Sequence, residues 1–130
     1  LVLSSIYLTE NEWIKFGKYR IFVGNLLSHQ PTYKNSKAVY YFNSEYIDKP
    51  LFVRTFKQGD RIHLPGMEQA KRISRIFIDE KIPVDERQLL PVIATEDEIV
   101  AVGSIRHSKK VSKSKRPFDN CVIIIKDDSL

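Results

Sequence analysis

The chain has 130 residues, of which 42% are hydrophobic and 28% are charged, a composition typical of a folded globular domain and not of a disordered segment. No apolar run approaches the ~18 residues that a membrane-spanning helix needs, and the N-terminus lacks the pattern of a secretion signal, so we expect no membrane partner. The single cysteine excludes an internal disulfide. Together these features predict a cytoplasmic protein.

Positive charge is unevenly distributed along the chain. The net charge of +5 comes from 21 basic and 16 acidic residues, and residues 104–116 hold six of the basic residues with no acid among them. Lys and Arg neutralise phosphates without reading the base sequence. This segment is therefore either a solvated basic loop or a phosphate-contacting one, and the sequence leaves both interpretations open.

The N-terminal third of the chain has a β pattern. Alternating aromatic and β-branched residues predict strands over 2–8, 19–23 and 38–42, and a polar loop over 28–37 separates the last two. The chain opens at Leu1, without an initiator methionine and in the middle of this pattern, so we expect it to be part of a longer protein.

A strand, a tight turn and a short strand are predicted over residues 51–64. Residues 51–56 alternate as in a strand that has one face against a core. Gly59 permits a positive φ angle and Asp60 can hydrogen-bond the neighbouring backbone, and together they predict the turn. Arg54 is either an exposed residue or a buried partner of Asp60.

The next element is a predicted helix from about residue 70 to about residue 82. Its apolar face is formed by Ala70, Ile73, Ile76 and Phe77. The opposite face carries the cations Lys71, Arg72 and Arg75. Like charges one turn apart and cations in the first turn are both unfavourable, so a polyanionic partner becomes a reasonable hypothesis. Asp79 lies four residues after Arg75, a spacing at which the two side chains are expected to pair.

The rest of the chain returns to strands. Pro83 ends the helix, and residues 84–87 resemble a short helical turn. Residues 92–94 and 99–102 have the spacing of a β-hairpin, and the continuous apolar run at 121–125 predicts a buried strand.

No catalytic or metal-binding motif stands out. The three histidines and Cys121 lack the spacing of a zinc site or of a Cys/His pair, and no glycine-rich phosphate loop is present in the sequence. We therefore expect no catalytic, cofactor-binding or metal-binding residue in this chain. The aromatic residues of the central stretch are expected in the core, not as platforms for bases: Phe52, Phe56 and Phe77.

An ordered series of residues resembles the C-terminal domain of bacterial tRNA(Ile)-lysidine synthetase. The series comprises Leu51, Val53, Arg54, Gly59, Asp60, Arg61, Gly66, Met67, Lys71, Arg72, Phe77, Ile78, Asp79, Lys81, Ile82, Pro83, Glu86, Arg87, Pro91 and Val92. The likeness begins near Tyr41 and fades after Ser108. Each piece alone is weak, but the kept order and spacing make the resemblance specific.

The resemblance implies an enzyme that uses ATP to adenylate the wobble cytidine of a minor isoleucine tRNA, after which lysine displaces AMP to form lysidine. In that family the chemistry belongs to the N-terminal domain, whose Ser-Gly-Gly-x-Asp-Ser loop for ATP does not occur in this sequence. The implied cofactor, ATP, would therefore bind outside the chain. The C-terminal domains of the family hold the body and acceptor stem of the tRNA and help to reject the similar methionine tRNA.

The resemblance also implies the fold. We expect an α+β domain with a small mixed or antiparallel sheet or sandwich and one main helix at about 70–82, similar to a domain of the phenylalanyl-tRNA synthetase β-chain. Residues 1–43 would be the mostly β end of a preceding C-terminal subdomain, and residues 44–130 the tRNA-binding domain.

The residues expected to contact tRNA are cations of the resembling stretch. They are Arg54, Arg61, Lys71, Arg72, Arg75, Lys81, Arg87 and Arg106. The alternative interpretation of this set is solvated surface charge. A second function also stays open, a protein-interaction module in which an exposed strand such as residues 122–125 forms a homodimer.

Overall fold

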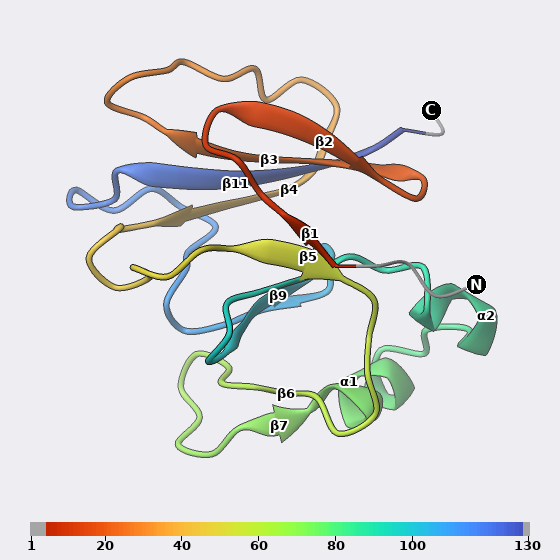
Figure 1. Cartoon of the computed structure of the whole chain (residues 1–130). Coiled ribbons are helices and arrows are strands. Elements are labelled where there is room, and N and C mark those ends of the chain that lie inside the picture. Colours follow the sequence, from red (N-terminus) through yellow and green to blue (C-terminus); the bar gives the residue numbers. More distant parts are fainter. Residues whose placement is uncertain (1–4, 129–130) are drawn as a thin grey trace.

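Two antiparallel sheets, a small ribbon and two short helices make up the described part of the chain, residues 5–128, in this computed structural model (Figure 1). The four-stranded sheet has the order β2 (Glu12–Phe16), β3 (Tyr19–Asn25), β11 (Cys121–Asp127) and β4 (Ser36–Phe42). The five-stranded sheet has the order β1 (Ile6–Tyr7), β5 (Phe52–Arg54), β8 (Val92–Ala94), β9 (Ile99–Val102) and β10 (Arg106–His107). The ribbon and helices are β6 (Arg61–Ile62), β7 (Lys71–Arg72), α1 (Ile73–Asp79) and α2 (Val84–Arg87).

The elements stack in three layers. Figure 1 shows the four-stranded sheet above the five-stranded sheet, with α1 and the ribbon below both. Side chains from the two sheets share one apolar cluster, in which Ile123 and Ile125 of β11 lie with Val53 and Val100. A second cluster on the opposite face of the five-stranded sheet joins that sheet to α1. The predicted α+β class, with antiparallel sheets in a sandwich, is confirmed.

Strand β11 is the centre of the four-stranded sheet. It pairs with β3 along one edge and with β4 along the other. Its apolar run is buried on both faces, since Ile123 packs between the sheets and Ile124 packs with Phe22 on the outer side. The buried strand predicted at 121–125 is confirmed. The expectation that the strand at 122–125 is exposed is wrong, because this strand has neither a free edge nor exposed side chains. A homodimer formed through another surface stays a prediction.

The N-terminal strands are longer or shorter than the sequence pattern indicated. The strands predicted at 19–23 and 38–42 are confirmed as β3 and β4, which each extend by two residues. Residues 12–16 form a further strand, β2, which the sequence did not predict. Of the strand predicted at 2–8, the structure has only Ile6–Tyr7, and residues 1–4 lie outside the described part.

The predicted division between residues 1–43 and 44–130 does not correspond to separate sheets in the described structure. Strand β11 from the second range inserts between β3 and β4 of the first, and β1 of the first range pairs with β5 of the second. As a statement about domain units, the boundary stays a prediction.

Helix α1 is shorter than predicted, at Ile73–Asp79 in place of about 70–82. It begins late because residues 71 and 72 pair as β7 with β6, and because the Ile73 N–H donates to the Asp60 carbonyl at 2.9 Å. It ends early because Lys81 adopts a left-handed φ of 56°. The predicted buried face of Ile73, Ile76 and Phe77 is confirmed. No helix within residues 5–128 has the length and apolar character to cross a membrane.

Candidate nucleic-acid interface

The ribbon presents two arginines side by side. Arg61 of β6 and Arg72 of β7 are directly opposite partners in the antiparallel register, and both are exposed. Neither has an ion-pair partner within residues 5–128. Like charges directly opposite each other destabilise a β pair, so local stability alone does not account for this arrangement. The pair is the strongest concentration of uncompensated charge on the ribbon.

A buried ion pair holds the turn that leads into the ribbon. Arg54 Nη1 and Nη2 donate to Asp60 Oδ2 at 2.8 Å and to Asp60 Oδ1 at 3.0 Å, and the two side chains are only 12% and 11% exposed. The same carboxylate accepts the Lys57 N–H at 2.8 Å, and Gly59 has the positive φ, 95°, that the turn requires. Arg54 is therefore the largely buried partner of Asp60, and the ion pair holds the turn that precedes the ribbon.

A second group of cations surrounds Asp79 at the end of α1. Lys71 Nζ lies 2.8 Å from Asp79 Oδ2, and Arg75 Nε lies 3.3 Å from Asp79 Oδ1, so the predicted pairing with Arg75 is confirmed. The hydrogen bond from Lys71, helped by the charges of Lys71, Arg75 and Arg106, lowers the pKa of the Asp79 carboxyl. One carboxylate thus faces two cations, and Arg75 remains 67% exposed.

The remaining three residues of the predicted set have different surroundings. Arg106 pairs with Glu80 of the turn after α1. Arg87 donates its Nε–H to the Ile82 carbonyl at 2.9 Å and lies over the Phe77 ring at 5.8 Å, so it fastens α2 to α1. Lys81 is exposed and has no ion-pair partner in the described chain.

The structure thus sorts the eight predicted residues by availability. Those that are exposed and lack a carboxylate partner in the described chain are Arg61, Arg72 and Lys81. Those that share a carboxylate but reach solvent are Lys71, Arg75 and Arg106. The two that are committed to internal contacts are Arg54 and Arg87. Contact of any of them with RNA stays a prediction.

Three of the six cations in the basic segment 104–116 pair with acids that lie outside the segment. Besides Arg106, Lys110 Nζ lies 2.5 Å from Glu98 Oε2, and Arg116 Nε lies 2.9 Å from Asp119 Oδ2. The cations of the segment that keep no carboxylate partner in the described chain are Lys109, Lys113 and Lys115. Half of the cations of the segment are thus neutralised within the described chain and half are not, so whether the segment contacts phosphates stays a prediction.

Two further cations flank the ribbon, of which the sequence analysis missed Lys57 and placed Lys109 only within the basic segment. Lys57 begins the turn before β6, and the Lys109 N–H donates to the His63 carbonyl at 2.9 Å, which ties the basic segment to the end of the ribbon. Both lysines are exposed. The run of basic residues drew attention to Lys109, but the sequence could not predict its contact with His63, because the two residues are far apart in the chain.

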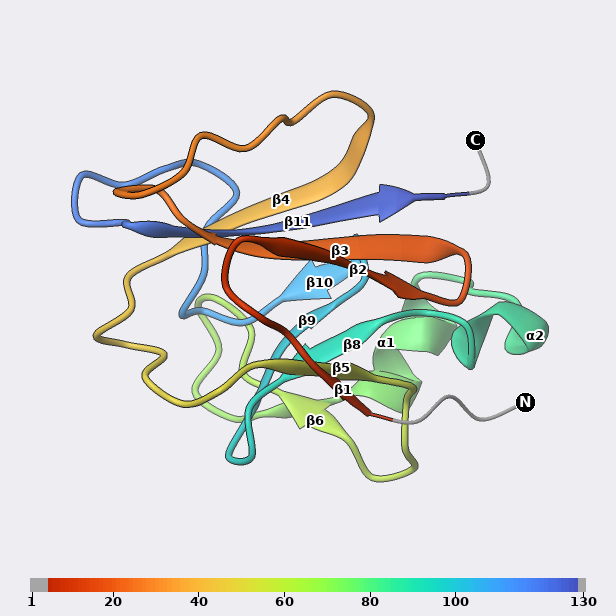
Figure 2. The ribbon, with the colours of Figure 1, turned by 45° about the horizontal axis from the view of Figure 1, so that its top comes forward.

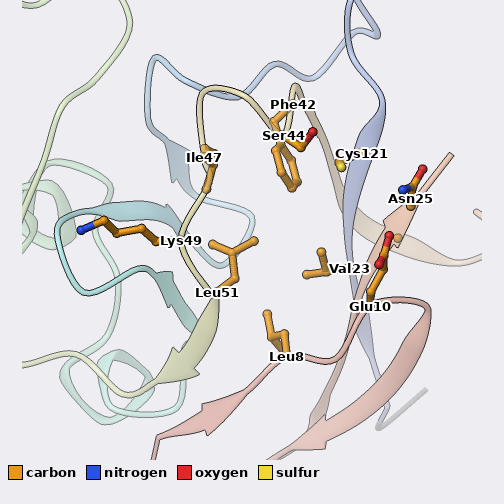
Figure 3. A pocket seen from close by; sticks show the side chains of 11 residues that line it. Leu8, Glu10, Val23, Asn25, Phe42, Ser44, Ile47, Lys49, Leu51 and Cys121 are labelled. Carbon is orange, nitrogen blue, oxygen red and sulfur yellow. The ribbon is translucent and has the colours of Figure 1, made fainter. Parts of the chain in front are cut away.

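A hollow lies between the edges of the two sheets. Figure 3 shows its mainly apolar lining, with Leu51 and Val23 inside, Glu10 on one side and Lys49 pointing away. Lys49 is engaged elsewhere, by Glu96 at 3.0 Å and Asp97 at 2.8 Å.

The only thiol in this hollow is unsuited to nucleophilic attack. Burial, with smaller contributions from the charges of Glu10 and Asp119, raises the pKa of the Cys121 thiol, so the reactive thiolate is scarce at neutral pH. Residues 5–128 also contain no group of three His, Cys, Asp or Glu side chains placed to hold a metal ion.

The fold and this surface define a small α+β domain whose ribbon carries two cations without a carboxylate partner in the described chain, with the partly neutralised Lys71 and Arg75 beside them. The chain belongs to the family described as the TilS substrate C-terminal domain, whose family model matches residues 51–118. The predicted family is thereby confirmed.

Comparison with known proteins agrees with this assignment. The chain is 32% identical over 107 residues to a tRNA(Ile)-lysidine synthase of Caldanaerobacter subterraneus, a match that covers 82% of this chain and 23% of that protein. It is 36% identical over 76 residues to a tRNA(Ile)-lysidine synthase of Bacillus subtilis, covering 58% of this chain and 16% of that one. The chain therefore spans less than a quarter of either relative.

A solved structure shares the fold. The crystal structure of a TILS C-terminal domain superposes with a TM-score of 0.72 and 24% sequence identity, over 95% of each chain. This likeness supports the arrangement of sheets and helices over the part of the chain that the match covers. The predicted likeness to the phenylalanyl-tRNA synthetase β-chain stays a prediction.

Proposed function

We propose that this domain is a tRNA-binding part of a tRNA(Ile)-lysidine synthase and takes no direct part in the chemistry. In this proposal the parent protein acts in the cytoplasm and forms lysidine on an isoleucine tRNA, with ATP bound in a region outside this chain. The domain holds the body and acceptor stem of the tRNA so that the wobble cytidine reaches the catalytic region.

The observation that carries the proposal is the arginine pair on the ribbon. Directly opposite residues of an antiparallel pair have Cα atoms about 4.5 to 5.5 Å apart, so the Arg61 and Arg72 guanidiniums can engage one phosphate or two neighbouring ones. A bound phosphate converts their repulsion into two charge-assisted hydrogen-bonded pairs. The unfavourable local arrangement is thereby explained by a ligand outside the domain.

The neighbouring cations extend this positive surface. Arg75 and Lys71 share one carboxylate, so they retain net positive charge beside the ribbon. Flexible surface cations of this kind contact phosphates and riboses and follow the shape of an A-form helix, with little reading of bases. We therefore propose that this surface grips a double-helical part of the tRNA.

A salt series tests the proposal. The 130-residue chain is titrated with an isoleucine tRNA transcript, a methionine tRNA transcript and a blunt RNA hairpin at increasing salt. We expect binding to both folded tRNA and hairpin, with an affinity that falls linearly on a log–log scale as counterion release requires. Absence of binding to tRNA and hairpin at low salt would overturn the proposal.

A further inference from the structure

Exposed aromatic side chains gather at one end of the four-stranded sheet. Within residues 5–128 the exposed aromatic side chains are Tyr7, Tyr33, Tyr46 and Phe118. Tyr33 and Phe118 line the same hollow, whose volume is about 370 Å³, and Tyr46 packs edge-on against Phe118 with ring centroids 6.1 Å apart. Solvent-exposed aromatic rings that cluster in this way mark an interaction site.

Three segments build this hollow, which we call the aromatic hollow. They are the end of β3 with the loop after it, the edge strand β4, and residues 115–120 before β11. The Leu26 N–H donates to the Asn120 carbonyl at 2.8 Å, and the Tyr41 N–H donates to the Ser112 carbonyl at 2.7 Å. These bonds fix the segments together, and Figures 1 and 2 both show the chain leaving β3 and the chain entering β11 at the same end of the sheet.

Phe118 is held as a fixed platform. The Arg116 guanidinium lies over its ring at 5.0 Å, and Arg116 is itself anchored by Asp119, with Nε to Oδ2 at 2.9 Å and Nη2 to Oδ1 at 3.0 Å. The Phe118 carbonyl also accepts a hydrogen bond from the Asn43 amide. The ring is nevertheless 50% exposed, so an ordered aromatic surface is offered to solvent.

Charge around the aromatic hollow is positive. Lys115 lines the hollow and Lys34 follows Tyr33, and neither has a carboxylate partner in the described chain. The one acid in the lining, Asp119, is buried and already paired with Arg116. Gln30, also in the lining, offers a side-chain amide that can donate to and accept from a base edge.

We propose that the aromatic hollow is a second RNA site, which takes an unpaired nucleotide by stacking its base on Phe118 while Lys115 and Lys34 contact the flanking phosphates. Aromatic rings interleaved with cations are the arrangement by which proteins bind single-stranded nucleic acid. A double helix cannot use such rings, because its base faces are already stacked. The site therefore complements the ribbon, which is proposed to contact only the phosphates and riboses of the RNA. It rests on the proposed RNA-binding function and extends that function to unpaired nucleotides.

Two labelled probes separate the two sites, a short single-stranded RNA and a blunt-ended RNA duplex, which has no unpaired nucleotide, with binding followed by fluorescence anisotropy. Stacking of one base on an aromatic ring corresponds to about 5- to 140-fold in affinity. We expect Phe118→Ala to weaken single-strand binding by a factor in this range and to leave duplex binding unchanged. Phe118→Trp should retain the single-strand affinity, because it keeps an aromatic face.

A matched control is the exposed aromatic Tyr7 on β1, in the other sheet. Tyr7→Ala should change neither affinity. Equal losses of single-strand affinity for Phe118→Ala and Tyr7→Ala, or no loss for Phe118→Ala in a variant that melts as the parent does, would overturn the proposal. Self-association of the chain that depends on Phe118, without single-strand binding, would also overturn it and assign the hollow to a protein contact. Absence of duplex binding in the parent chain, with single-strand binding kept, would count against the ribbon and not against this site.

Discussion

The double variant Arg61→Ala, Arg72→Ala is the sharpest test of the ribbon. Both side chains are exposed and neither has a carboxylate partner within residues 5–128, so their removal breaks no ion pair there. It also relieves a cross-strand repulsion, a term of at most about 1 kcal/mol. We therefore expect the free energy of unfolding to stay unchanged or to rise by a few tenths of a kcal/mol, roughly.

The expected loss of RNA affinity follows from counterion release. If each arginine contacts one phosphate, the slope of log affinity against log salt becomes shallower by about 0.9 per contact, or about 1.8 for the pair. At ~0.1 M salt the same relation gives an affinity about 60-fold weaker. A smaller change of about 0.9 would indicate that only one of the two arginines reaches a phosphate.

The assay is a salt series with tRNA on the parent chain, the double variant and a charge-matched control. The control Lys18→Ala, Arg20→Ala removes two positive charges from the turn and strand at the far sheet, where Arg20 Nε lies 3.0 Å from Asp128 Oδ1. It should shift the slope little, because exposed charges beyond about 10 Å are screened at 0.1 M salt. Equal effects of the two double variants would show that only net charge matters and would refute the argument from the ribbon.

Three further outcomes follow from the contacts. Arg54→Ala leaves the Asp60 carboxylate without its partner, so the free energy of unfolding, measured with urea, should fall by about 2 to 4 kcal/mol. A loss under about 1 kcal/mol would contradict a structural role for the pair. Lys71→Ala should raise the pKa of the Asp79 carboxyl toward its ordinary value, because the hydrogen bond that lowers it is lost; an NMR pH titration measures this, and an unshifted midpoint would contradict it. The Cys121 thiol, whose pKa is raised by burial, should react with iodoacetamide more slowly at pH 7.5 than a free cysteine peptide does, and its rate should climb as pH rises.

The pH dependence of stability has a definite sign for the carboxyl of Asp79. Its pKa is lower in the folded than in the unfolded chain, so its contribution to stability is present above the ordinary pKa of an aspartate. That contribution is lost as the pH falls through the lowered folded value. We therefore expect the difference in stability between the parent and Lys71→Ala to shrink on acidification, which urea unfolding at several pH values would measure.

Local patterns in the sequence predicted most of the elements but not where α1 begins. The apolar period of Ile73, Ile76 and Phe77 is a local property, and it located the buried helix face correctly. The extended conformation of residues 71 and 72 depends on pairing with β6, about ten residues earlier, and helical periodicity carries no information on that partner. A non-local hydrogen-bonded pair overrode the local pattern.

The same limit applies to the candidate site. The basic residues were visible in the sequence, but which of them are free depends on acids that arrive from other elements, such as Glu80 for Arg106 and Glu98 for Lys110. Arg54 and Asp60 lie six residues apart, and only the geometry of the turn shows that they form a bidentate pair. The sequence therefore predicted that the domain has a cationic surface, but not which of its cations lack an acidic partner.

The two proposed RNA contacts lie on different layers of the domain. The ribbon packs beyond the five-stranded sheet, and the aromatic hollow lies at one end of the four-stranded sheet, as Figure 1 shows for β6, β7, β4 and β11. Changes at sites that are well separated and share no partner act additively on free energy. The combined loss of affinity from Arg61→Ala, Arg72→Ala and Phe118→Ala should therefore equal the product of the separate fold-changes, for an RNA that touches both sites. Such an RNA must carry its paired and unpaired parts on different sides of the domain. A combined loss no greater than the larger of the two would show that the RNA uses one site at a time.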